Sequence, residues 1–189
     1  IGTKRTLVFC VTKHQAEMTA TIFNRYRDAP DTAFSGTAEW VCDTTPKAQR
    51  HATLQNFKSG KTQVLVNVNV YSEGFDEPGV EYIVQARPTL SRCIYAQQIG
   101  RGTRPLPGVV DGLETSGERR AAIAASAKPC CTTIDYVGIT GRLKLIGPAD
   151  VLGGKLSDEV LECAKQRALG RPLEHHGVVD DAADAVLAA

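Results

Sequence analysis

The chain has 189 residues, of which 42% are hydrophobic and 23% are charged, and its formal net charge is +1 at pH 7. These values are typical of a globular protein, and the length suits one domain with appended segments. The near-neutral charge excludes a general electrostatic attraction to nucleic acid, so any such contact must be local. No apolar run approaches the roughly 20 residues of a membrane-spanning helix, and the N-terminus lacks a signal-peptide pattern. We therefore expect a cytoplasmic protein without a membrane partner.

The first 70 residues alternate between strand and helix signals. Residues 6–11 form a continuous apolar run, which is typical of a strand buried on both faces of a parallel sheet. Thr12 and Gln15 then match a capping box, which predicts a helix from Lys13 to about Arg27. The same reasoning predicts a strand at 38–42, a helix from the Thr-Pro at 45–46 to about 58, and a strand at 63–68.

The second half of the chain continues this alternation. Residues 71–80 contain two glycines and a proline and predict a loop at the carboxyl end of a strand, where open α/β sheets place ligands. A strand at 81–86 follows, and Ser91 is expected to cap a helix that carries Arg101 and Arg104 and ends at Pro105. Beyond it we predict a mobile insertion at about 106–129 with a short helix near 118–127, a strand at 132–137, and a helix at 157–169. The pattern predicts an α/β fold with a mostly parallel central sheet and helices on both faces.

The cysteines do not indicate a metal centre. They lie at Cys10, Cys42, Cys93, Cys130, Cys131 and Cys163, with no C-x-x-C pair and no histidine at ligand spacing. This arrangement favours neither a zinc site nor a disulfide framework. We expect no metal site within the chain and several buried thiols.

Two arginines, Arg101 and Arg104, lie three residues apart in the segment 95–104. On a helix they would project from neighbouring positions of one face. Guanidinium groups match phosphate oxygens and stay charged at any working pH, so the pair is a candidate phosphate clamp. The alternative for two arginines alone is a solvated helix face.

The tripeptide at 60–62, Gly-Lys-Thr, imitates the end of a phosphate-binding loop. Such a loop needs a glycine five residues before its last glycine, where this chain has Gln55. The tripeptide also follows a predicted helix and precedes a strand, which is the reverse of the required order. We interpret Gly60 as a helix end in the left-handed conformation.

Four segments together resemble the second RecA-like domain of superfamily 2 helicases and translocases, the group of excision-repair helicases and restriction-enzyme motor subunits. Residues 7–14 resemble motif IV, and residues 43–46 with Arg50 resemble the next conserved turn and helix. Residues 64–78 resemble motif V, and residues 97–104 match motif VI, Q-x-x-G-R-x-x-R, in full. The resemblance implies a three-layer RecA-like helicase C-terminal domain over 1–150, followed by a helical extension and acidic tail over 151–189. Residues 140–142 and 147–150 resemble an extension of some bacterial and phage members.

The resemblance also implies roles in ATP hydrolysis. Arg101 and Arg104 would reach the β and γ phosphates of ATP, and Gln97 would position the nucleotide or the attacking water. ATP and Mg²⁺ would both be held mainly by a first RecA-like domain of the same polypeptide, which these 189 residues do not contain. The fragment alone is therefore expected to be inactive, although the full-length protein would be an ATP-dependent helicase or translocase.

Further ATP contacts are implied for the motif V loop and the helix before the arginines. Asp76 would approach the ribose, and Gly74 would let the backbone come close to the nucleotide. Glu73 and Gly100 are expected to belong to the same site. For Asp76 alone, the alternative is a loop carboxylate that caps local amides.

The nucleic-acid contacts implied by the resemblance are Thr12, Lys13, Thr44 and Asn67. These residues would contact backbone phosphates, which positions a strand without reading its sequence. We expect DNA rather than RNA as the partner. An alternative function is a non-catalytic RecA-like module that binds nucleic acid or another protein, and a self-contained enzyme using Gly60, Lys61 and Thr62 is a third.

Overall fold

A computed structural model of the chain describes residues 1–27, 29, 34–70, 75–136, 157, 159, 160 and 162–164. Its centre is a five-stranded sheet in the order β2-β3-β1-β4-β5, and every neighbouring pair is parallel. The strands are β1 (Thr6–Cys10), β2 (Ala38–Val41), β3 (Val64–Asn67), β4 (Tyr82–Ala86) and β5 (Thr132–Asp135). The predicted α/β fold with a mostly parallel sheet is confirmed.

The sheet divides the core into two layers because successive strand residues point to opposite faces. Leu7 and Phe9 of β1 belong to one cluster of buried side chains, whereas Val8 and Cys10 belong to the other. All five residues of β1 are buried. The continuous apolar run at the start of the sequence is therefore explained by a central strand that is covered on both faces.

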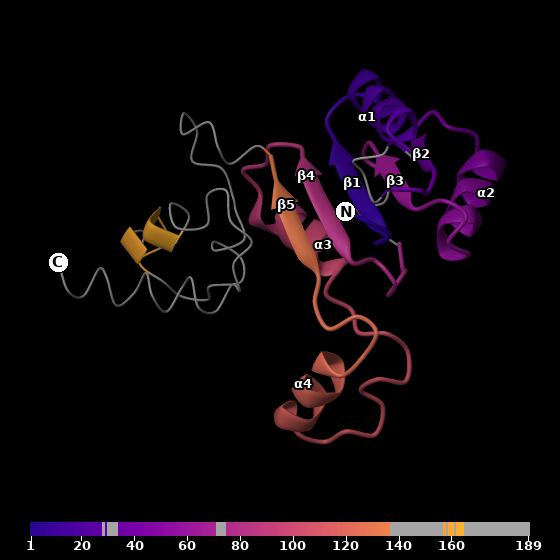
Figure 1. The fold of residues 1–189 in the computed structure, drawn as a ribbon. Coiled ribbons are helices and arrows are strands. Elements are labelled where there is room, and N and C mark those ends of the chain that lie inside the picture. Colours follow the sequence, from indigo (N-terminus) through magenta and orange to yellow (C-terminus); the bar gives the residue numbers. More distant parts are fainter. Residues whose placement is uncertain are drawn as a thin grey trace.

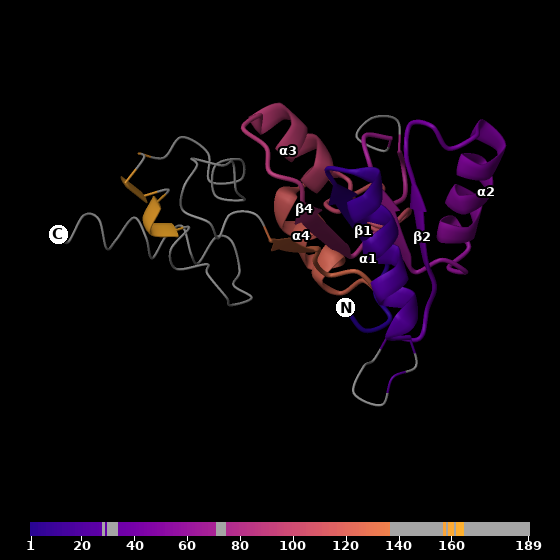
Figure 2. The ribbon, with the colours of Figure 1, turned by 90° about the horizontal axis from the view of Figure 1, so that it is seen from above.

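Helices cover both faces of the sheet (Figure 2). Helix α1 (Lys13–Arg25) packs Ala16 and Ala20 against the cluster of Val8 and Cys10. On the opposite face, α2 (Lys47–Lys58) contributes Phe57 to the cluster of Leu7 and Phe9. Helix α3 (Arg92–Gly100) lies on this second face as well, where the Tyr95 hydroxyl lies 3.3 Å from Oδ2 of Asp135.

The helix ends follow the expected capping chemistry at several positions. The Thr12 hydroxyl accepts a hydrogen bond from the Gln15 amide, and the Gln15 side chain accepts one from the Val11 amide. Gly60 follows α2 with φ of +81°, which confirms a left-handed helix end. The tripeptide at 60–62 thus lies between a helix and β3, and Thr62 is fully buried beside Glu39. A phosphate-binding loop at this position is excluded.

Helix α3 is shorter than predicted. It ends at Gly100, and Arg101 is its C-terminal cap. The prediction that the two arginines share one face of a helix is therefore wrong. The chain turns before Pro105 is reached, because Gly102 allows a close approach to the sheet. A Cβ at Gly102 would lie 2.2 Å from Sγ of Cys131 and 2.9 Å from Cγ1 of Ile83.

The segment between α3 and β5 extends beyond the sheet and contains α4 (Ser116–Ala124) (Figure 1). Thr115 and Glu118 form a complete capping box at its start, with both reciprocal hydrogen bonds present. None of the side chains of α4 is buried. The predicted short helix is confirmed, and it begins two residues earlier than expected because Thr115 supplies the cap.

Two predictions for the C-terminal part of the chain lie partly or wholly outside the described residues. Of the helix predicted at 157–169, residues 159, 160 and 162–164 are described as helical, and the motifs at 140–142 and 147–150 are not described. Within the described part of the chain, no helix has the length and apolar character to cross a membrane. The same residues contain no group of three or more His, Cys, Asp or Glu side chains that would suit a metal ion.

Candidate functional site

The connection from β3 to β4 crosses the sheet face that carries α2 and α3. Phe75 is 2% exposed and packs on Phe57, with ring centroids 6.1 Å apart. Val80 is fully buried in the same cluster. The connection starts at the carboxyl end of β3 but must return to the amino end of β4, because the two strands are parallel. Residues 75–80 therefore lead to the amino end of β4. The sequence predicted that the whole loop at 71–80 stays at the carboxyl end of a strand, and for residues 75–80 this is wrong.

Both arginines contact this connection. Nη1 of Arg101 donates a 2.7 Å hydrogen bond to the carbonyl oxygen of Phe75. Nη1 of Arg104 forms an ion pair with Oδ1 of Asp76. The side chains of Arg104 and Asp76 remain 43% and 67% exposed. The structure thus joins segments that lie 26 and 28 residues apart into one small cluster of charges.

The two arginines have different environments. The guanidinium of Arg101 is anchored to a backbone carbonyl next to a core phenylalanine, and the residue is half-buried. Arg104 follows the end of α3, and its partner is an exposed carboxylate. Exposed ion pairs contribute only about 0 to 1 kcal/mol, so Arg104 exchanges its partner at little cost.

Gln97 and Gly100 lie on α3 just before the arginines. Gln97 is half-buried, and Gly100 is the last residue of the helix. A Cβ placed on Gly100 would meet no atom within 4 Å. The backbone at Gly100 is therefore open on this side. Glu73 and Gly74, the other residues expected here, lie outside the described residues.

A second cluster of polar side chains lies at the carboxyl ends of β1 and β2. Nζ of Lys13 donates to the hydroxyl of Thr44 at 3.0 Å and lies 3.1 Å from Oδ1 of Asp43. The hydrogen bond from Lys13 lowers the pKa of Asp43 below its usual value. Thr12, the residue before Lys13, is exposed while it caps α1. The structure therefore brings together three of the four predicted nucleic-acid contacts.

Asn67, the fourth predicted contact, is buried and is not among the exposed side chains of this second cluster. It is 1% exposed, and its side-chain amide donates a 2.9 Å hydrogen bond to the carbonyl of Val8. Its register partners in the sheet are Phe9 of β1 and Val41 of β2, both of which belong to the core. A strand position on the core face thus withdraws the side chain of Asn67 from solvent, and its contact with a nucleic-acid phosphate stays a prediction.

Two contributors to these clusters were missed by the sequence analysis. Asp43 partners Lys13, and Lys128 donates hydrogen bonds to the carbonyl oxygens of Pro78 and Arg104. Asp43 lies in the turn at 43–46 that resembles a motif of the family, so its place in that turn was a usable signal. Lys128 precedes a proline in an irregular segment, and nothing in its sequence pattern distinguishes it from a solvated lysine.

Comparisons with known proteins agree with the fold and the motifs. Residues 2–105, more than half of the chain, match the family model described as helicase conserved C-terminal domain. The Saccharomyces cerevisiae protein IRC3, whose name describes it as an ATP-dependent helicase, is 41% identical over 66 residues. These residues are 35% of this chain and 10% of IRC3. A 51.5 kDa protein of a Lactococcus phage is 40% identical over 60 residues, which are 32% of this chain and 13% of that protein.

A solved structure shows the same architecture. The C-terminal domain of the DEAD-box protein Dbp5 aligns with a TM-score of 0.50 and 14% identity over 96% of this chain and 82% of that one. At this identity the similarity concerns the fold alone. The matched segments span only about a tenth of the two curated relatives. On the family match, the chain belongs to the family of helicase conserved C-terminal domains.

Proposed function

We propose that this chain is the second motor domain of an ATP-dependent superfamily 2 helicase or translocase. In this proposal it contributes Arg101 and Arg104 to an ATP molecule that is held mainly, together with Mg²⁺, by a first RecA-like domain of the same polypeptide. The observation that carries the proposal is the contact of both arginines with residues 75 and 76. This contact assembles motifs V and VI into one cationic site on the surface.

The donor set of this site fits a polyphosphate. Guanidinium groups form paired hydrogen bonds with phosphate oxygens, and such contacts stabilise the charge that develops in phosphoryl transfer. Arg104 presently contacts the exposed carboxylate of Asp76, an anionic partner that a phosphate oxygen can replace. Asp76 would then be released toward the ribose hydroxyls. Bound ATP supplies the phosphoryl group, and Mg²⁺ neutralises its oxygens.

Each residue of the site has a distinct task in this proposal. Arg101, anchored on Phe75, orients the cluster, and Arg104 is the more mobile donor to the phosphates. Gln97 positions the nucleotide or the attacking water from the same helix. Gly100 lets the nucleotide approach the backbone, because the space beside it is open. Glu73 and Gly74, which precede Phe75 in the sequence of motif V, are further proposed contacts of the nucleotide.

The second cluster is the proposed contact with a nucleic-acid backbone. Lys13, Thr12 and Thr44 offer an ammonium and two hydroxyls beyond the carboxyl ends of β1 and β2, together with their backbone amides. Such groups bind phosphates without regard to base sequence. We expect DNA rather than RNA as the partner, and a cytoplasmic location.

Substitution of Arg104 by alanine in the full-length protein tests the motor assignment. Loss of an arginine that contacts the transferring phosphate lowers turnover by about 10³-fold or more. We expect nucleic-acid-stimulated ATPase activity to fall by at least about 100-fold, with the melting temperature within about 2 °C of wild type because the Arg104–Asp76 pair is exposed. Steady-state ATPase assays and differential scanning calorimetry measure the two effects.

Arg92→Ala is the matched control, because Arg92 is an exposed arginine at the opposite end of α3. It should leave stimulated turnover within about twofold of wild type. Wild-type stimulation in the Arg104→Ala protein would contradict the motor assignment. It would favour the second candidate, a non-catalytic module that binds nucleic acid through the cluster around Lys13.

A further inference from the structure

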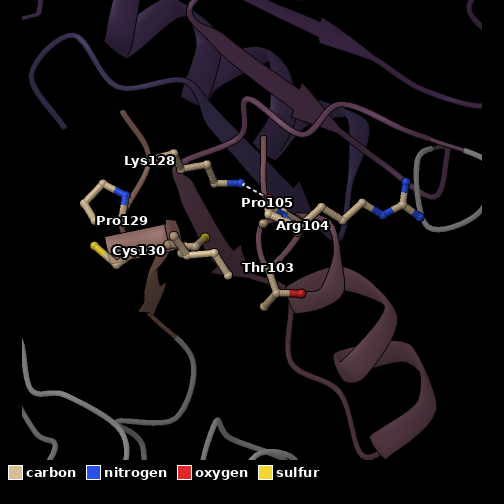
Figure 3. Close-up of a pocket in the computed structure, with 9 residues that line it drawn as sticks. Thr103, Arg104, Pro105, Lys128, Pro129 and Cys130 are labelled. Atoms are coloured by element: carbon tan, nitrogen blue, oxygen red, sulfur yellow. Dashed lines mark hydrogen bonds between the residues drawn. The ribbon is translucent and has the colours of Figure 1, made fainter. Parts of the chain in front are cut away.

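Lys128 is a buried lysine on the segment that returns from α4 to β5. It is 5% exposed, although lysines are rarely buried without a partner. Its ammonium donates two hydrogen bonds, at 2.6 Å to the carbonyl of Pro78 and at 2.8 Å to the carbonyl of Arg104. Figure 3 shows its side chain extending to the backbone at Arg104 and Pro105, while the side chain of Arg104 extends away from Lys128.

Both partners of Lys128 are backbone atoms of the candidate ATP site. Pro78 lies two residues after Asp76, and the second carbonyl belongs to Arg104 itself. Burying an ammonium costs free energy unless hydrogen bonds compensate it, and here both of these hydrogen bonds go to backbone carbonyls. The lysine therefore constrains the paths of two chain segments that are 26 residues apart.

The surroundings of this contact are tightly packed. Gly79 lies so close to the Arg5–Glu77 ion pair that a Cβ would be 2.7 Å from atoms of both side chains. Gly102 packs even more closely on the Cys131 side chain and nearly as closely on the Ile83 side chain. A displacement of either segment would therefore disturb the other through Lys128. Beside this contact lies a cavity of about 220 Å³, lined by residues 102–105, Ile123 and 128–131.

Burial lowers the pKa of Lys128, and the nearby Cys131, Glu81 and Glu77 oppose this effect. The ammonium is thus kept at an energetic cost in a place where it has two directed hydrogen bonds. A lysine whose only role was solubility would project its ammonium into water.

We infer that Lys128 is a positioning residue that fixes the backbone of Arg104 against the segment that carries Asp76, so that the arginine side chain is presented to the nucleotide in one place. This inference rests on the proposed role of Arg104 in ATP hydrolysis. A misplacement of about 1 Å at a catalytic group can lower turnover about 100-fold. Through Lys128, the segment that returns from α4 to β5 therefore acts on the candidate active site.

The first test measures the contact itself in the full-length protein, independently of ATPase activity. The amides of Val80 and Gly102 donate to the carbonyls of Glu77 and Ile99 and report on the two linked segments by hydrogen–deuterium exchange. In Lys128→Met, exchange in the peptides covering both segments should rise at least about threefold. In Lys58→Met, which replaces an exposed lysine at the end of α2, it should not change. Unchanged exchange in Lys128→Met would overturn the inference.

The second test measures the effect on turnover. Lys128→Met should lower the ATPase kcat about 10- to 100-fold with the KM for ATP within about threefold, since the residue positions a group that acts in the transition state. Lys128→Arg keeps the charge and the donors and should recover kcat to within about fivefold of wild type. If Lys128→Met does not fold, Lys128→Gln replaces it in the test. This variant retains one donor group and should also lower kcat, by less than the decrease expected for Lys128→Met. Wild-type kcat in either neutral variant would overturn the inference.

A double-mutant cycle distinguishes this inference from the proposed function. In an Arg104→Ala background, Lys128→Met should cause no further loss, because its effect acts through Arg104. A further loss of the same size as in wild type would show an independent role and would overturn the inference. If Arg104→Ala alone keeps full activity, the proposed function fails, and the exchange experiment still decides whether Lys128 links the two segments.

Discussion

At the scale of single residues, the two arginines of motif VI differ in how firmly they are held. Arg101 donates to a carbonyl beside a core residue, whereas Arg104 pairs with an exposed carboxylate. The free energy needed to release Arg104 is on the order of 1 kcal/mol or less. In the proposed site, a bound phosphate would therefore recruit Arg104 without disturbing the core, and Arg101 would stay anchored on the carbonyl of Phe75.

Cys131 provides a test of packing beneath these arginines. Burial raises the pKa of its thiol to about 11, and the nearby Lys128 ammonium only partly opposes this. A thiol whose pKa is higher in the folded than in the unfolded state contributes stability that is complete below pH 9 and is lost as the pH rises toward 11. The loss corresponds to about 2 to 3 kcal/mol over this range.

We therefore expect Cys131→Ala to reduce the pH dependence of the unfolding free energy between pH 8 and 11 by about that amount. Urea denaturation at several pH values measures it. Cys93→Ala is the control, because Cys93 is exposed and should leave the pH profile unchanged. Identical profiles for Cys131→Ala and wild type would show that the thiol is solvated in solution.

At the scale of secondary-structure elements, the end of α3 decides where the arginines lie. Ser91 starts the helix through its hydroxyl, and Gly100 ends it. Gly102 then lies directly against the side chains of β4 and the segment before β5. Two glycines in one motif thus have different surroundings, since Gly100 faces open space and Gly102 faces the sheet.

This difference predicts opposite effects of two similar substitutions. Gly100→Ala should raise the unfolding free energy by up to about 1 kcal/mol, because alanine is the better helix former and its Cβ meets nothing. It should nevertheless raise the KM for ATP if a nucleotide approaches the backbone there. Gly102→Ala should lower the unfolding free energy by about 1 to 3 kcal/mol through overpacking. Urea denaturation and ATPase kinetics measure both variants.

The double variant Gly102→Ala/Cys131→Ala is the control for the close approach. Removing the sulfur relieves the nearest contact, and the contact with Ile83 remains, so part of the lost stability should return. No recovery at all would show that the strain at Gly102 does not come from the Cys131 side chain.

At the scale of the whole molecule, the two candidate sites lie at opposite ends of the sheet. The cluster around Lys13 follows the carboxyl ends of β1 and β2, and the arginines lie beside the amino ends of β4 and β5. A strand of five residues separates these ends by on the order of 15 Å. In the proposed motor, one rigid domain thus has a nucleic-acid face and an ATP face.

The nucleic-acid face can be tested through its salt dependence. Each lysine that neutralises a phosphate adds about one unit to the slope of log K against log salt concentration. In the full-length protein we expect Lys13→Ala to reduce this slope by about one and to weaken binding of unrelated DNA sequences equally. Fluorescence anisotropy over a range of salt concentrations measures both effects.

Lys61→Ala is the matched control, because Lys61 is an exposed lysine just before the amino end of β3. It should change neither the salt slope nor the KM for ATP, which also tests the exclusion of a phosphate-binding loop at 60–62. An unchanged slope in Lys13→Ala would remove this residue from the interface.

The sequence by itself determined the alternation of strands and helices, the parallel sheet and the motif pattern that identifies the family. These features depend on local patterns, namely apolar runs such as 6–11, the cap at Thr12 and the arginine spacing at 101 and 104. Only the tertiary structure decided that α3 ends before the arginines, that Asn67 is buried and that Lys128 bonds to the backbone of Arg104. Each of these depends on contacts between residues distant in sequence, such as Gly102 with Ile83 and Cys131, and local patterns carry no information about such contacts.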